Sequence, residues 1–109
     1  MSLFAEYKKE REGKYVLELD GGFAVYSIQD KRCWIEDIYV EPRLRRTGLA
    51  SKLADMIKWA AKKEGCEKLL GTCQPDSRGA TESMQAMLAY GFRLKLIQFP
   101  LIWLEMEID

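Results

Sequence analysis

The chain of 109 residues contains no histidine and only three cysteines. Histidine is the commonest general base and the commonest metal ligand, so its absence removes the usual candidate for both roles. The cysteines, Cys33, Cys66 and Cys73, form no C-x-x-C pair, which argues against a disulfide framework and against a zinc site. We therefore expect reduced thiols and no bound metal ion.

The chain also lacks an excess of charge and any long apolar run. Its 17 basic residues balance 17 acidic residues, so composition gives no reason to expect nucleic-acid binding. No apolar run reaches ~18 residues, so nothing is expected to span a membrane, and the N-terminus has no apolar segment typical of a signal peptide. These absences predict a cytoplasmic protein that folds as one domain over residues 1–109.

Hydrophobic periodicity predicts the element order β-β-β-α-β-α-β-β. We expect strands over 15–19, 23–28, 33–40, 68–73, 93–98 and 102–108, and helices over 48–63 and 80–90. Residues 4–13 are mostly charged and fit either an edge strand or a short helix. The strand–helix–strand unit over 33–73 needs a crossover that leaves its two strands parallel. The fold class is therefore α+β, a mixed, mostly antiparallel sheet with a β-α-β core and helices on its faces.

The segment V-E-P-R-L-R-R-T-G-L-A-S, residues 40–51, joins a predicted strand to a predicted helix and carries three arginines. Where a loop enters a helix, the free N–H groups of the first turn and the helix dipole make an anion site. Gly48 lets a ligand approach the backbone closely, and small side chains follow it at Ala50 and Ser51. The segment predicts a bound phosphate or diphosphate, and the alternative is a solvated basic loop.

The same segment reads V-x-P-x-x-R-x-x-G-x-A from Val40 to Ala50. It resembles the acetyl-CoA signature of the GNAT N-acetyltransferase superfamily, whose core is R/Q-x-x-G-x-G/A. The pair Gly91-Phe92 resembles the start of that family's penultimate strand, so the resemblance covers residues 14–109. It implies an enzyme that transfers the acetyl group of acetyl-CoA directly to a primary amine of a small molecule or protein.

The resemblance also implies a cofactor site built mainly from backbone. The CoA diphosphate would lie on the loop and first turn, and the strand before the loop would pair with the pantetheine arm as an added strand does. The strand over 68–73 would splay away to admit that arm, and a backbone N–H near Tyr39 or Val40 would hold the thioester oxygen. The cofactor-binding residues so implied are Ile38, Tyr39, Val40, Arg45, Arg46, Thr47, Gly48, Leu49, Ala50 and Ser51.

Two adjacent acids, Glu36 and Asp37, are candidates for the base that takes the proton of the amine. Strand alternation would send their side chains to opposite faces of the sheet. The run resembles the L-E-D-x-x-V segment of the spermidine/spermine acetyltransferase branch, which favours Glu36 as the base and Asp37 as a substrate-facing or structural acid. The alternative is that both are solvated or ion-paired acids.

The family's usual acid is missing from this chain. The tyrosine often found four residues before the glycine of G-F is replaced by Met87, which has no proton to donate, and Ala80 stands where an asparagine is frequent. Tyr90 either protonates the CoA thiolate or only packs, and Ser83, Cys73 or water are further candidates. These departures favour an alternative function, a CoA-binding or interaction module with little or no transferase activity.

The acceptor side is less defined by the sequence. Only 13 residues precede Lys14, where family members carry a strand and two helices, so we expect an open acceptor site. A large acceptor such as a protein amine, or a second subunit, would fit such a site. The apolar run 97–104 fits core packing, or else the face of a homodimer or a substrate lip. A plain α+β protein that binds no cofactor is the third alternative.

Overall fold

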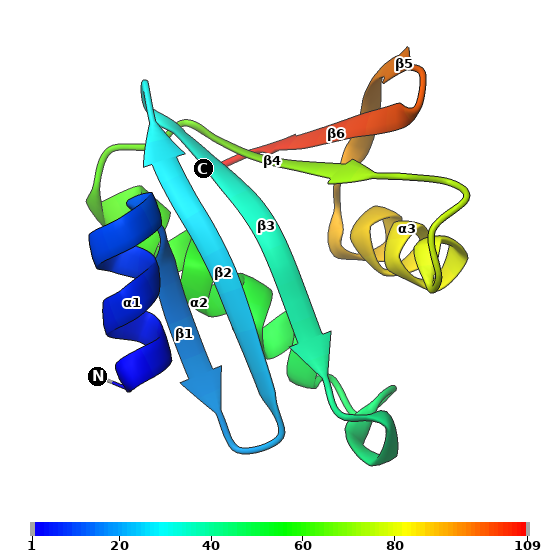
Figure 1. Ribbon diagram of the computed structural model, residues 1–109. Coiled ribbons are helices and arrows are strands. Elements are labelled where there is room, and N and C mark those ends of the chain that lie inside the picture. The colour runs from blue at the N-terminus through cyan, green and yellow to red at the C-terminus, as the bar shows by residue number, and fades with distance from the viewer. Residues whose placement is uncertain (1, 109) are drawn as a thin grey trace.

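The computed structural model describes residues 2–108 as one six-stranded sheet with helices on both faces (Figure 1). The strands follow one another across the sheet in the order β1-β2-β3-β4-β6-β5. Their bounds are β1 Tyr15–Leu19, β2 Gly22–Gln29, β3 Arg32–Val40, β4 Lys68–Cys73, β5 Arg93–Gln98 and β6 Leu101–Glu107. The helices are α1 Leu3–Glu12, α2 Leu49–Lys63 and α3 Ala80–Tyr90, with a short 3-10 helix, η1, over Pro42–Leu44. Across residues 2–108, every helix is too short or too polar to cross a membrane.

The predicted fold class is confirmed. Strands β3 and β4, joined through α2, are parallel, and the other neighbours in the sheet are antiparallel. The segment that fitted either a strand or a helix is α1, since Ser2 caps it by accepting a hydrogen bond from the Ala5 N–H at 3.1 Å. Gly13 ends it in the left-handed region, with φ of 67°.

Helices α2 and α3 pack on one face of the sheet, which we call the α2 face, and α1 packs on the other, the α1 face. Figure 1 shows α1 in front of β1 and β2, with α2 behind them. On the α2 face, Leu53 and Ile57 of α2 are fully buried against Cys33, Leu69 and Leu104 of the sheet. The two α2 residues are four apart, so they lie on one stripe of the helix. Burying each contributes about 1.5–3 kcal/mol.

Strand β3 contains a bulge at Glu36. Val25 pairs with Asp37 and Tyr26 pairs with Ile35, which leaves Glu36 without a partner on β2. The β3 side chains that pack in the core fall on both sides of the bulge: Cys33, Ile35, Ile38 and Val40. One inserted residue thus resets the alternation. Glu36 and Asp37 both lie on the α1 face, and the expectation of opposite faces is wrong because it assumed an uninterrupted strand.

Strands β3 and β4 separate after a short paired stretch, as expected. Their pairing runs from Arg32 with Lys68 to Ile35 with Gly71, and residues 36–40 of β3 have no partner on β4. Figure 1 shows the two strands diverging from this point. A Cβ added at Gly71 would lie only 2.4 Å from the Met87 side chain, so this glycine lets α3 pack closely where the strands part.

Candidate active site

The loop after β3 leads into the N-terminus of α2, which has no side-chain cap. This N-terminus lies beside the opening that forms where β3 and β4 separate. Gly48 is the N-cap of α2 with φ of 90°, and no side chain bonds to the first turn. The first backbone bond of the helix runs from the Lys52 N–H to the Gly48 carbonyl at 3.0 Å. The N–H groups of residues 49–51 therefore have no partner inside the helix. A Cβ added at Gly48 would meet no atom within 4 Å, so the space in front of the turn is open.

A cavity of about 300 Å³ lies at this turn, lined by Asp20, Leu44, Thr47, Gly48, Leu49 and Lys52. Lys52 brings a positive charge to this cavity, and the sequence reasoning did not include it among the cofactor-binding residues. Its position four residues after Gly48 was the available signal, because such a side chain lies one turn along the helix. Of the three arginines, Arg43 pairs with Glu41 at the exposed rim.

The free edge of β3 presents alternate backbone groups to the opening. The Glu41 N–H donates to the Gly21 carbonyl at 2.8 Å, so this pair is a hydrogen-bonded pair of the ladder. Backbone bonds alternate along an antiparallel strand, hence Tyr39 also points its backbone toward β2, whereas Ile38 and Val40 point theirs toward the opening. The Val40 carbonyl accepts a hydrogen bond from Arg45 Nε at 2.9 Å. The structure therefore brings Ile38 and Val40 to the opening and turns the backbone of Tyr39 away from it.

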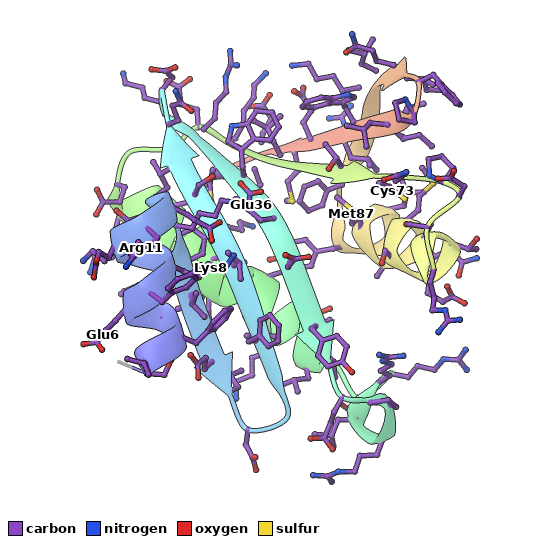
Figure 2. The ribbon with its side chains drawn as sticks, in the orientation of Figure 1. Glu6, Lys8, Arg11, Glu36, Cys73 and Met87 are labelled. Atoms are coloured by element: carbon purple, nitrogen blue, oxygen red, sulfur yellow. The ribbon has the colours of Figure 1, made fainter. Side chains whose placement is uncertain are left out.

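The two acids stand on the α1 face beside the point of divergence, and both are exposed. Glu36 Oε2 accepts a hydrogen bond from Ser27 Oγ at 3.0 Å. Lys14 Nζ lies 3.6 Å from Glu36 Oε1, and the attraction of that carboxylate raises the pKa of Lys14. Within residues 2–108, no ion pair or side-chain hydrogen bond engages Asp37. Figure 2 shows Glu36 on β3, Cys73 at the end of β4 and Met87 on α3.

The candidate acids Tyr90 and Cys73 both donate hydrogen bonds to neighbouring residues. The Tyr90 hydroxyl donates to Asp55 Oδ1 of α2 at 2.6 Å. Burial and the nearby carboxylate raise the pKa of Tyr90, so its proton is held more tightly than that of a free phenol. The buried Cys73 thiol donates to the Ala80 carbonyl at 3.4 Å. Tyr90 therefore links α3 to α2, and Met87 occupies the site beneath Gly71.

The sequence was compared with models of known protein families. A model of the acetyltransferase (GNAT) family matches residues 2–96. The chain belongs to the GNAT acetyltransferase family. A search of curated proteins by sequence finds no match.

Several solved structures share the fold. Nourseothricin acetyltransferase superposes with a TM-score of 0.71 at 22% identity, over 82% of this chain and 58% of its own length. The PaiA N-acetyltransferase of Thermoplasma acidophilum, solved with coenzyme A, gives 0.78 at 14%, over 96% and 68%. Ard1 of Thermoplasma volcanium gives 0.73 at 19%, over 98% and 78%. The chain thus spans little more than half of nourseothricin acetyltransferase, and at these identities the likeness is one of fold.

Proposed function

We propose that the protein transfers the acetyl group of acetyl-CoA directly to a primary amine. The observation that supports this function best is the separation of β3 and β4 beside the uncapped N-terminus of α2. An opening in the sheet gives an extended ligand a free strand edge, and the helix end gives its phosphates a set of N–H donors. Membership of an acetyltransferase family makes acetyl-CoA the ligand that fits both features.

The cofactor would be held chiefly by backbone. The N–H groups of Leu49, Ala50 and Ser51 would donate to the diphosphate, with the positive charges of Arg46 and Lys52 close by. Thr47 has a different task here, because its hydroxyl donates to the Leu44 carbonyl and closes the loop. Arg45 would add electrostatic attraction for the diphosphate at the rim of the phosphate site.

The pantetheine arm would pair with the free edge of β3. Ile38 and Val40 present their backbone groups there, and the Val40 N–H is the donor best placed for the thioester oxygen. The Val40 carbonyl already accepts a hydrogen bond from Arg45 Nε, and its second lone pair could accept one from pantetheine. The backbone of Tyr39 would not pair with pantetheine, and its side chain would instead lie on the α1 face, where the amine is proposed to bind.

The amine would be held and deprotonated on the α1 face. Glu36 is the proposed base, and Asp37, beside it on the same face, would hold the incoming ammonium group. A general base contributes roughly 10²–10⁴-fold to such a reaction. A thiol with a pKa of ~8.5 leaves as a thiolate without a strong acid, so the proposed reaction does not need a proton from Tyr90.

The alternative function is a CoA-binding module with little transfer, and Met87 at the point of divergence favours it. Titration with CoA, together with acetyl transfer to a panel of primary amines, separates the two. Saturating CoA should stabilise the fold by ~2–4 kcal/mol in either case. Amide products identified by mass support the transferase, whereas CoA binding without transfer to any amine leaves the module. If CoA does not stabilise the fold, both the transferase and the CoA-binding module are refuted.

We also propose that a second copy of the chain covers β5. The run 97–104 divides in the structure, because Ile102 and Leu104 pack in the core while Ile97 and Phe99 are 67% and 95% exposed. Strand β5 is an edge of the sheet, so its outer backbone groups are free to pair antiparallel with the same strand of a partner. Light scattering should give the mass of a dimer for the wild type and the mass of a monomer for Ile97→Lys. A monomer mass for the wild type at high concentration would refute the proposed dimer.

A further inference from the structure

Lys14, in the turn between α1 and β1, places a primary amine against the proposed base. Its Nζ lies 3.6 Å from Glu36 Oε1 and 3.4 Å from Glu12 Oε1. In the part of the chain that the structure describes, it is the one lysine that pairs with either acid of the proposed acceptor site. An acceptor amine must come to the same place, so the chain already holds an ammonium group where the reaction needs one.

The backbone and the sheet register hold Lys14 in this place. Its N–H donates to the Lys8 carbonyl at 3.2 Å, at the end of α1. Strand β1 pairs with β2 from residue 15 opposite residue 26, so continuing that register by one residue puts Lys14 beside Ser27. Ser27 Oγ donates to the other oxygen of Glu36, Oε2, at 3.0 Å. Both oxygens of this carboxylate are thus engaged, and one of the groups that engage them is the Lys14 ammonium group.

The Lys14 side chain can move within the site. It is 28% exposed, and its stem of four carbons is flexible. Partly exposed ion pairs contribute little to stability, so Nζ can leave Glu36 at small cost. The pairing of β3 with β4 ends at Ile35, so Glu36 stands where the opening begins. An acetyl group brought along the free edge of β3 to this point would meet the Lys14 amine.

The charge of Glu36 both hinders and assists attack by Lys14. The attraction of this carboxylate raises the pKa of Lys14, so the ammonium form, which has no lone pair, is favoured. Attack needs the neutral amine, and Glu36 is also the group proposed to take the proton. An external alkylamine, with a pKa that is likewise near ~10 in water, needs the same step. Lys14 therefore meets the chemical requirements of an acceptor.

From this geometry we infer that Lys14 is an internal acceptor, which the protein acetylates when acetyl-CoA is bound and no other amine occupies the site. Nζ loses one proton to Glu36 and forms a bond to the thioester carbon. The C–S bond then breaks, CoA leaves with the bonding electrons as a thiolate, and the nitrogen loses a second proton to solvent. This inference rests on the proposed transferase function and assigns a modification site within it.

Acetylation would change the site in which it occurs. The amide formed at Lys14 carries no charge, so it cannot form an ion pair with Glu36 or Glu12. The Glu36 carboxylate is then free to meet an external ammonium group. Before acetylation the two amines exclude each other, because both need the same position beside Glu36. An external acceptor should therefore protect Lys14 from acetylation.

Mass spectrometry of peptides from the whole chain, incubated with acetyl-CoA alone, tests the inference. Lys9 is the internal reference, since it is exposed and, within residues 2–108, pairs with no acid. Lys14 should be acetylated roughly 10²-fold faster than Lys9, which is the advantage that a general base confers. Dilution of the protein at constant acetyl-CoA should not change the rate constant, because base and acceptor lie in one molecule. Equal rates at the two lysines, or a rate at Lys14 that falls on dilution, would overturn the inference.

Two variants distinguish the acids beside Lys14. Glu36→Gln should lower acetylation of Lys14 nearly to the rate of Lys9, because it removes the proposed base. Glu12→Gln is the matched control, since it makes the same chemical change at the other carboxylate, 3.4 Å from Nζ, and should leave the rate within a few-fold of the wild type. An equal loss in both variants would mean that nearby charge alone governs the reactivity of Lys14, against the inference.

A panel of primary amines, added to the same samples, separates this inference from the proposed function. An amine that is a good acceptor should suppress early acetylation of Lys14 and leave that of Lys9 unchanged. Transfer to external amines with Lys14 no faster than Lys9 would remove the internal acceptor and leave the transferase. Acetylation of Lys14 that Gly48→Glu does not slow would be chemical modification without the cofactor site, and would also overturn the inference. If neither Lys14 nor any amine is acetylated, both proposals fail.

Discussion

Replacement of Gly48 by glutamate tests the cofactor site at a single backbone position. Gly48 has φ of 90°, and an added Cβ meets no atom within 4 Å, so the side chain fits without a clash. Its cost to folding is the strain of a left-handed backbone, about 1–3 kcal/mol. A carboxylate about 4 Å from a bound phosphate is repelled by about 4 kcal/mol at an effective dielectric constant near 20. We therefore expect Kd for CoA to rise roughly 10³-fold.

Calorimetric titration with CoA measures this loss, and urea unfolding measures the strain separately. Gly48→Ala is the matched control, since it introduces the same backbone strain without the charge and should keep Kd within about tenfold of the wild type. Should Gly48→Glu unfold like the alanine variant and still bind CoA with wild-type affinity, the diphosphate cannot lie at this turn.

Three further predictions follow from the contacts. Glu36→Gln should lower kcat roughly 10²-fold or more without changing Kd for CoA, measured by steady-state kinetics at saturating amine; an unchanged kcat would remove it as the base. Tyr90→Phe should cost about 1 kcal/mol in urea unfolding through the lost bond to Asp55, with kcat within a few-fold of the wild type. The pKa of Tyr90 is raised in the folded protein, so this residue contributes its full share of the free energy of unfolding only below the ordinary tyrosine pKa of ~10. That share is lost as pH rises toward the raised pKa. The difference in free energy of unfolding between the wild type and Tyr90→Phe should therefore narrow above pH ~10. Ile57→Ala should cost about 2–5 kcal/mol in the same assay, and a smaller loss would contradict its place in the core.

The regular part of the fold could be predicted from the sequence because it depends on local patterns. The strand 68–73 and the helix 80–90 have the predicted bounds, and the amphipathic stripe of α2 places Leu53 and Ile57 in the core. Helix α1 could not be separated from a strand, because it buries only Ala5 among its residues and so shows little periodicity.

The bulge at Glu36 could not be predicted, because it depends on how β3 pairs with β2 rather than on the sequence of β3 alone. The same limit applies to the site. The glycine and small residues of the phosphate turn are contiguous in sequence and could be predicted. The hydrogen bond from Tyr90 to Asp55 joins residues 35 positions apart, and no local sign of it appears in the sequence. In the same way, Glu18, Phe23 and Tyr39 are neighbours across three strands only because of the register of β1, β2 and β3.

The measurement that tests the central claim most directly is an NMR titration of the backbone amides with CoA. The account predicts that the largest shifts fall on Leu49, Ala50 and Ser51 at the turn, and on Ile38 and Val40 at the free edge of β3. Tyr39, whose amide points toward β2, should shift less than Ile38 and Val40. Saturating CoA that leaves these amides unmoved, or that shifts residues on the far side of the sheet instead, would contradict the claim that the opening between β3 and β4 is the cofactor site.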